Sequence, residues 1–492
     1  MRFSFLPTLQ PRPGTLWWDA AFIGLVTLGQ LHVQGQLGAV MIPTENIAME
    51  QLNAGPHDYS WMNASYGLTA GLFVLLGGRL GDKFSAKYIF LLGYFLLSLF
   101  NLAMGFVSSA IPFDVLRALS GIGSALLLPS MVALLARQYP PGFKRTIAFA
   151  ALGALGPIGF MTHAAMSSLV VEQIGPRWIF WLEAIASAVF GLLGSLIIPQ
   201  DENDPSLSID AVGNVLGLSG MILFNFAWNQ GPLIGWENTA YVPVTLALGA
   251  LFIVAFFFWE KRQGDKALLP LAIFNKNVIG VCLALWWGWM SFGTWLYYTS
   301  MFIRDIRGHS HPLVICAQMV AITPPGVFAA LCVIWLNHNV KGHVTLAISM
   351  CWLCVGNILL GTTPRDQSLW PMLFPAEVIV VFGPDLSFAA SALIIANSVP
   401  VKMAGIAGGL INLIVNYSMS IGLGLAGTVE RYTNSSGGDL FQGYRSAFWF
   451  AACVSFAGLV LVLAFVRVEG VEGGEGYGEE VRGRGGEGKE VV

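Results

Sequence analysis

Charge is scarce in this chain of 492 residues. Asp, Glu, Lys and Arg make up 11% of it, against 55% hydrophobic residues. Soluble domains carry roughly 25% charged residues, so the composition excludes an ordinary soluble protein. It predicts an all-α polytopic membrane protein whose partners include the lipid bilayer. With a net charge of −3 and no basic patch, the chain is not expected to bind nucleic acid.

Catalytic and redox motifs are also scarce. The six cysteines lie in apolar runs, and we interpret even Cys351 and Cys354 as small packing residues rather than a redox or metal pair. The chain has no Gly-x-Ser-x-Gly elbow, no His-Glu-x-x-His sequence and no phosphate loop. We therefore predict that the protein is not an enzyme and uses no cofactor or metal. We also predict no cleaved signal peptide.

Long apolar runs, in contrast, fill most of the sequence. A bilayer core of about 30 Å needs roughly 20 apolar residues per helix. This length predicts fourteen spans, and an even number places both termini on one side of the membrane. The spans are expected near residues 16–42, 59–78, 88–108, 111–136, 146–171, 177–198, 209–229, 240–259, 277–302, 312–336, 344–361, 370–397, 404–428 and 446–466.

The charged segment at residues 77–88 sets the expected orientation. It separates two apolar runs, so we predict that it is a turn in water. Lys and Arg are enriched in cytoplasmic loops. Placing this turn inside leaves thirteen Lys and Arg in inner loops and six in outer loops, which predicts N-in and C-in. The inner loop at residues 199–210 has four acidic residues and no basic one, but acidic residues count little in this rule.

The charged turn contains the pattern Gly78-x-x-x-Asp82-Lys83-x-x-x-Lys87. This pattern resembles the cytoplasmic signature between the second and third spans of the major facilitator superfamily, although Ser85 stands where that family has a further glycine. Small residues let helices approach closely, and charged side chains interact with helix ends. The resemblance implies that these residues take part in the conformational switch of a carrier.

The fourth span contains an arginine inside an apolar helix. Arg117 costs roughly 2.5 to 3.5 kcal/mol to insert at the helix centre, so it should face a cavity or a carboxylate. Asp114, one helical turn away, is the simplest partner. The segment at residues 113–123 resembles the fourth-span signature of the same superfamily, whose arginine is associated with proton coupling. The alternative is an Arg117 that pairs with Asp114 and takes no part in transport.

The fifth span contains glycines and a proline at residues 153–159. This stretch resembles the Gly-Pro signature that marks exporters of the superfamily. Proline bends a helix and small residues permit tight contact, so Gly156 and Pro157 are expected to act as a hinge. His163, one turn further on, can titrate near neutral pH and is a candidate for proton coupling. A hydrogen-bonded packing residue is the alternative for His163.

The twelfth span contains the strongest anomaly. Gly383 and Pro384 are expected to break the helix, and Asp385 follows them near the middle of the bilayer. Transporters place substrate and ion sites at broken helices. We predict that Asp385 is a protonatable site, and the alternative is an Asp that caps the second half of the helix. Glu377 and Glu183, nearer the outer interface, are further candidates.

Polar residues also share faces on two other spans. Gln30 and Gln34 are four residues apart, as are Asn412 and Asn416, so each pair lies on one helix face. We predict that these faces line a cavity, with interhelical hydrogen bonding for packing as the alternative. The sequence Asn434-Ser-Ser, in an outer loop, is a predicted glycosylation site.

Residues 225–236 and 405–430 resemble the fungal fourteen-span drug:proton antiporter subfamily, in the branch of aminotriazole-resistance, borate-efflux and low-affinity ammonium transporters. The similarity covers about residues 16–466. It implies the major facilitator fold, with two six-helix bundles and two additional helices. The expected parts are a cytoplasmic N-terminal segment at 1–15, the N-terminal bundle at 16–198, two inserted helices with inner loops at 199–270, the C-terminal bundle at 271–467 and a disordered cytoplasmic tail, rich in Gly and Glu, at 468–492.

The resemblance implies a proton-coupled efflux antiporter of small toxic solutes or drugs that works by alternating access. Its partners would be a small-molecule substrate and protons, and the carrier would act as a monomer. The plasma membrane is the expected location, with the vacuolar membrane as the alternative. Two other functions stay open: a facilitator or importer of a small polar solute such as ammonium, and a transport-inactive membrane sensor.

Overall fold

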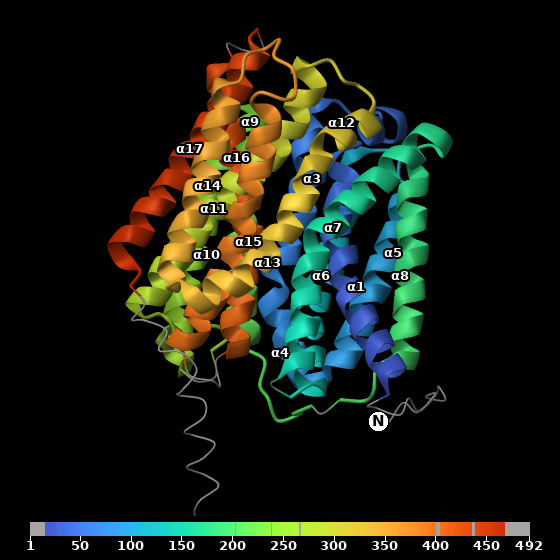
Figure 1. Ribbon diagram of the computed structural model, residues 1–492, viewed down its shortest axis with the longest axis vertical. Helices are drawn as coiled ribbons and strands as arrows, with labels where there is room; N and C mark the ends of the chain where they lie inside the picture. Colours follow the sequence, from blue (N-terminus) through green and yellow to red (C-terminus); the bar gives the residue numbers. More distant parts are fainter. Residues whose placement is uncertain are drawn as a thin grey trace, which may run out of the picture.

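Long helices run side by side between the two ends of the molecule in the computed structural model (Figure 1). The structure describes residues 15–140, 142–201, 203–237, 239–264, 267–399, 404–434 and 438–467. These ranges leave out most of the expected N-terminal segment and the tail from residue 468. They also leave out Lys402, a residue of a predicted inner loop.

Each predicted span corresponds to one helix or to a pair of consecutive helices. This agreement follows from the length of the apolar runs, which is the length that a bilayer requires. The helices are α1 (Leu16–Met41), α3 (Tyr59–Leu72), α4 (Val74–Phe84), α5 (Ala86–Met104), α6 (Ala110–Gln138), α7 (Phe143–Ile174), α8 (Arg177–Ile197), α9 (Ala211–Ile234), α10 (Tyr241–Gln263), α11 (Lys276–Met301), α12 (Pro312–Met319), α13 (Thr323–Asn339), α14 (Gly342–Thr362), α15 (Leu373–Ser398), α16 (Ala404–Thr433) and α17 (Leu440–Phe465).

Twelve helices in the described part of the chain are long and apolar enough to cross a membrane. α1 is not among them, because polar residues such as Gln30 and Gln34 interrupt its apolar face. α3 and α4 are 14 and 11 residues long, since the regular helix is interrupted at Phe73. Both α1 and α3 nevertheless pack inside the bundle, against α7 and α6. The predicted count of fourteen spans is therefore not confirmed by helix length and composition.

The helices pack mainly with neighbours from the same half of the chain. In the first half, α1 packs against α7, and α5 packs against α6 and α8. In the last half, α14 packs against α15 and α17, and α11 packs against α16 and α17. α9 and α10 form a pair, and α9 also contacts α3 and α16. The inserted pair therefore lies where the two halves of the chain meet.

The predicted charged turn at residues 77–88 is wrong in its extent. α4 continues to Phe84 and α5 begins at Ala86, so the bend is at Ser85, which has a positive φ of 104°. α4 stays helical because its glycines allow close packing on α6. A Cβ added at Gly77 would lie only 2.7 Å from the carbonyl oxygen of Ala125.

The acidic loop after α8 holds this bend in place. The Asp201 carboxylate accepts hydrogen bonds from the backbone N–H of Ala86 at 2.8 Å and of Lys87 at 3.2 Å, which caps the start of α5. It also accepts from the Ser85 hydroxyl and forms an ion pair with Arg137 at 2.5 Å. The acidic loop thus pairs with a positive charge on a neighbouring helix, that of Arg137 on α6. The sequence did not predict this pairing.

We expect Asp201→Ala to lower the free energy of unfolding by about 2 kcal/mol, because it removes a helix cap and a charged hydrogen bond. Thermal unfolding of the purified protein in detergent measures this loss. Asp204→Ala is the matched control in the same loop, since among the described residues the Asp204 side chain bonds only the exposed Ser206. Equal stability of the two variants would contradict the capping role.

Candidate functional site

A cavity of 830 Å³ lies between the first and last halves of the chain. α1 and α7 line one side of it, and α11, α15 and α16 line the other. It begins at the end of the bundle where α7 starts, at Gly142 and Arg145, and reaches Phe160 and Leu296. The wall is mostly apolar and contains six aromatic side chains: Tyr66, Phe149, Phe160, Trp289, Phe292 and Phe388.

The four predicted cavity residues all line this cavity. Gln30 and Gln34 come from α1, and Asn412 and Asn416 come from α16, so the two pairs lie on opposite walls. Asn412 and Asn416 donate to backbone carbonyls of their own helix. Within the described ranges, none of the four side chains makes an interhelical hydrogen bond, so nothing supports the alternative role in packing.

Asp385 lines the same cavity. Its Oδ2 atom is buried and has no hydrogen-bond partner among the described residues. The predicted break at Gly383 and Pro384 is wrong, because α15 is continuous through both residues. Asp385 consequently does not cap a second half-helix. Gly383 instead makes room for α14, since a Cβ added there would lie 2.3 Å from Leu353.

Gly156 and Pro157 of α7 also line the cavity, and α7 is continuous through the proline. Gly326 of α13 lies between this hinge and the acid. A Cβ added at Gly326 would lie 3.4 Å from Pro157 and 3.5 Å from Asp385 Oδ2. The predicted hinge and the predicted protonation site therefore share one neighbourhood, although they come from opposite halves of the chain.

Arg117 is 1% exposed and points toward α1. Its Nη2 atom donates to the carbonyl oxygen of Gln36 at 2.5 Å, and its guanidinium lies 4.6 Å from the centre of the Tyr66 ring. The predicted pairing with Asp114 is wrong: no ion pair within 4.0 Å joins them in the described structure. The guanidinium points into the bundle, where a carbonyl and an aromatic face contact it, while its buried Nε atom has no hydrogen-bond partner among the described residues.

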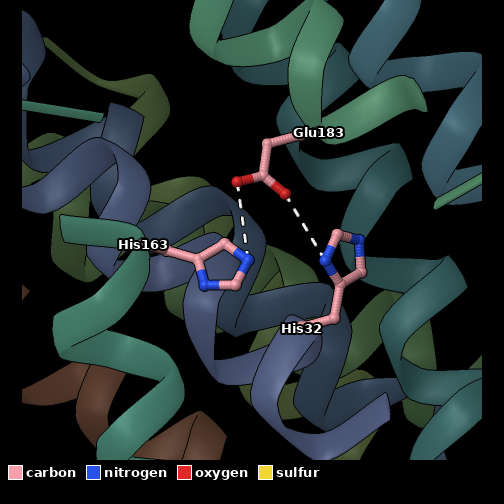
Figure 2. Close-up of side chains that lie close together, drawn as sticks. All are labelled: His32, His163 and Glu183. Atoms are coloured by element: carbon pink, nitrogen blue, oxygen red, sulfur yellow. Dashed lines mark ion pairs between the residues drawn. The ribbon is translucent and has the colours of Figure 1, made fainter. Parts of the chain in front are cut away.

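His163 belongs to a buried cluster with His32 and Glu183, from α7, α1 and α8 (Figure 2). Glu183 lies 3.5 Å from His32 Nδ1 and 3.6 Å from His163 Nε2. The side chains are of the types that ligate metals, and one atom from each lies within 4.8 Å of the others. Sequence reasoning treated His163 as isolated, because nothing in its local spacing connects it to α1 or α8.

The predicted switch residues of the charged turn lie at the end of the bundle where the cavity begins. Gly78 faces Pro129 of α6, and a Cβ added there would make an ordinary contact at 3.7 Å. The charged residues join the ends of neighbouring helices within the first half of the chain. Asp82 pairs with Arg137 at 2.8 Å, Lys83 Nζ donates to Leu207 O at 2.7 Å, and Lys87 Nζ donates to Ile198 O at 2.5 Å.

Contacts at the other end of the bundle join the two halves. Arg304, which follows α11, lies 3.5 Å from Glu45 and 4.9 Å from the centre of the Tyr59 ring. α7 also packs there against α12. Asn434 directly follows α16 and is 8% exposed, while the two serines after it lie outside the described residues, so its glycosylation stays a prediction. The cavity is thus closed at this end.

A bundle of apolar helices around a cavity that reaches one end suits a multi-pass membrane carrier of small molecules. Residues 28–340 match the family model described as Major Facilitator Superfamily, and the chain belongs to this family. The protein is therefore an integral membrane transporter, and the prediction that it is not an enzyme is confirmed.

Similar proteins indicate which members of the family this chain resembles. The chain is 36% identical to the low affinity ammonium transporter of Saccharomyces cerevisiae, over 92% of this chain and 90% of that protein. It is 34% identical to the efflux pump terJ of Aspergillus terreus, over 92% and 89%. It is also 34% identical to the aminotriazole resistance protein of Saccharomyces cerevisiae, over 92% and 85%. The expected relationship to this group of fungal transporters is confirmed.

Solved structures support the fold. A crystal structure of an auto inhibited POT family peptide transporter superposes with a TM-score of 0.67, covering 92% of this chain and 99% of that one. The sequences are 14% identical, so the likeness concerns the fold alone. The predicted major facilitator fold is confirmed.

Gly35 of α1 should tolerate no side chain, because a Cβ there would lie 2.3 Å from the His163 ring. We expect Gly35→Ala to lower stability by about 1 to 3 kcal/mol, the usual cost of overpacking. Gly24→Ala on the same helix is the control, since it has open space and gains about 0.5 to 1 kcal/mol of helix propensity. Thermal unfolding compares the two. A Gly35→Ala protein as stable as Gly24→Ala would contradict the close contact between α1 and α7.

Proposed function

We propose that this protein exports small toxic solutes or drugs across a membrane in exchange for protons, by alternating access. One observation carries the proposal: Asp385 lines a mostly apolar cavity, and its buried Oδ2 atom has no hydrogen-bond partner among the described residues. A charge at membrane depth is costly unless it is protonated, paired or hydrated. The cavity can therefore close at low cost only when a proton, or a substrate with a compensating charge, occupies the acid.

This constraint accounts for exchange. When Asp385 holds a proton, the empty carrier can rearrange and release the proton on the other side. When a substrate neutralises or shields the acid, the loaded carrier rearranges instead. One carboxylate cannot bind a proton and a substrate fully at the same time. The proton and the substrate therefore compete for Asp385. Arg117, Asp114 and His163 are proposed to take part in this coupling, with the first held against Gln36 and Tyr66.

The size and chemistry of the cavity support a solute larger than ammonium. Its volume of 830 Å³ lies within the range of about 300 to 1,000 Å³ usual for drug-sized ligands. A water molecule, similar in size to ammonium, occupies about 30 Å³ of liquid. The relationship to a low affinity ammonium transporter keeps the ammonium facilitator as the second candidate. That function would give flux without a proton gradient, and a sensor would give no flux.

The proposed topology has fourteen spans with both termini in the cytoplasm. α1, α3 and α4 are too polar or too short to be recognised as spans from composition and length alone. The packing of α1 and α3 inside the bundle supports counting α1 as one span and α3 with α4 as another. The two six-helix units would be residues 16–198 and 271–467, with the inserted pair at 199–270 between them. With the basic end inside, the cavity opens to the cytoplasm, as an exporter loading its substrate requires. We propose a monomer in the plasma membrane, with the vacuolar membrane as the alternative.

Asp385→Asn should abolish solute export driven by a pH gradient in reconstituted vesicles, because an amide cannot gain or lose the proton. Substrate-linked proton movement, followed with a pH-sensitive dye and a panel of drugs, borate and ammonium, is the measurement. Unchanged gradient-driven transport would eliminate the proposed role of Asp385.

Glu377→Gln is the matched control, because Glu377 is a buried carboxyl on the same helix that does not line the cavity as described. We expect this variant to keep gradient-driven export. If Glu377→Gln loses it and Asp385→Asn does not, the protonation site lies at the outer end of α15 instead.

Asp82→Asn should change switching rather than substrate binding, since Asp82 pairs with Arg137 away from the cavity. Partly exposed ion pairs contribute up to about 1 kcal/mol, so we expect turnover to fall by no more than about fivefold. The Michaelis constant should stay within about twofold of the unaltered protein. Vesicle transport at varied solute concentration separates the two, and a large change in Michaelis constant with normal turnover would contradict this role.

A further inference from the structure

The cluster of His32, His163 and Glu183 lies outside the cavity wall. His32 and Glu183 are 0% and 1% exposed, and His163 is 11% exposed. None of the three is among the residues that line the cavity in the described structure. The cluster is therefore a separate group of titratable side chains at membrane depth, and its hydrogen atoms can be assigned from its neighbours.

The neighbours determine which ring nitrogen carries hydrogen. The Ser187 hydroxyl donates to the carbonyl oxygen of Glu183 at 2.8 Å, so it accepts from His32 Nε2–H at 2.7 Å. The Gln36 amide nitrogen, which can only donate, lies further from His32 Nε2, at 3.4 Å, and donates to Glu183 at the shorter distance of 2.7 Å. His163 Nδ1 lies 3.1 Å from the carbonyl oxygen of Gly159, which can only accept. In the neutral rings, His32 Nδ1 and His163 Nε2 consequently carry lone pairs.

Both lone pairs point toward the Glu183 carboxylate (Figure 2). His32 Nδ1 lies 3.5 Å from Oε2, and His163 Nε2 lies 3.6 Å from Oε1. In the described structure, neither His32 Nδ1 nor Glu183 Oε1 has a hydrogen-bond donor. Three acceptor groups that face one another in a buried place repel unless a positive charge lies between them. With the ring hydrogens in these positions, the geometry favours a cation there.

A proton satisfies this requirement better than a metal ion. Ligands of a tetrahedral zinc ion lie about 3.3 Å apart, given bonds of about 2.0 Å, so the spacing alone would admit a metal. The positive charge of Arg117 attracts Glu183, and Gln36 lies between the two residues. The Gln36 side-chain amide donates to Glu183 at 2.7 Å, and the Gln36 backbone carbonyl accepts from Arg117. A divalent ion beside that guanidinium would leave two uncompensated positive charges at membrane depth, whereas a proton leaves one.

We propose that His32, His163 and Glu183 form a second proton-binding site, in which one proton is shared between the carboxylate and the two imidazoles. The added proton binds a ring nitrogen or a carboxylate oxygen, and the resulting N–H or O–H donates to the facing acceptor. Titratable or charged groups on the neighbouring helices also face the site. They are Tyr66 on α3, Tyr94 on α5 and Arg117 on α6, besides the three members on α1, α7 and α8.

α7 connects this site to Asp385. Pro157 approaches Asp385 through Gly326, and His163 lies six residues further along the same helix, against Gly35 of α1. A bend of α7 at Pro157 would change the distance from His163 to Glu183 and hence the strength with which the proton is held. Proton binding by the cluster does not depend on the proposed export function, but its use in the transport cycle rests on that function.

Nitrogen-15 NMR of histidine in the purified full-length protein tests the site directly. We expect His32 to carry hydrogen on Nε2 and His163 on Nδ1 at high pH. On acidification, both signals should shift in one shared step, and Glu183→Gln should replace that step by separate transitions. His57→Gln assigns the exposed His57 and should leave the shared step unchanged. If Glu183→Gln fails to fold, Ser187→Ala removes the partner of His32 and should alter its hydrogen position.

Two results would overturn the proposal. One is a spectrum in which neither His32 nor His163 changes between about pH 4 and 9, a range that brackets ordinary histidine titration. The other is one equivalent of zinc in the purified protein, with both signals changing when a chelator removes it. In transport assays, the Glu183→Gln protein should move about one proton fewer per exported solute than the unaltered protein. Asp385→Asn can fail its own test while the NMR result stands, so the two proposals are distinguishable.

Discussion

Direct backbone contact between α1 and α7 positions both of the sites described above. A Cβ added at Gly38 would lie 2.0 Å from the carbonyl oxygen of Phe160, and one added at Gly159 would lie 2.2 Å from that of Leu31. Lipid supplies no hydrophobic driving force between helices, so such close packing of small residues stabilises the pair. One side of the pair lines the cavity through Gln34, and the other closes on Glu183.

The polar groups buried in the bundle differ in how fully their hydrogen bonds are satisfied. Arg117 has a carbonyl and an aromatic face as partners, although its Nε atom has no hydrogen-bond partner in the described structure. Asp385 has an oxygen without a partner in the described structure, beside a cavity that a solute or proton can enter. Glu183 has Gln36 on one oxygen and faces two ring nitrogens. The latter two carboxylates are therefore candidates for binding a cation.

The two ends of the bundle are joined in different ways. At the closed end, Arg304 and Glu45 connect the last half of the chain to the first. At the end where the cavity begins, Asp201 and Arg137 connect helix ends within the first half. Arg79 also donates to the carbonyl oxygen of Ala267 at 3.1 Å at this end, and contacts at the closed end must break before the molecule opens there. This asymmetry suits a rocking motion between two states.

The sequence alone determined the positions of the helices and the family, because bilayer thickness sets the length of each apolar run and the signature motifs are local. It also predicted the polar faces of α1 and α16, since a helical repeat is visible in one segment. The tertiary structure decided the continuity of α15 through Pro384, the cap that Asp201 provides, the partner of Arg117 and the cluster around Glu183. Those features depend on how closely separate helices approach one another, and no local spacing in the chain encodes that distance.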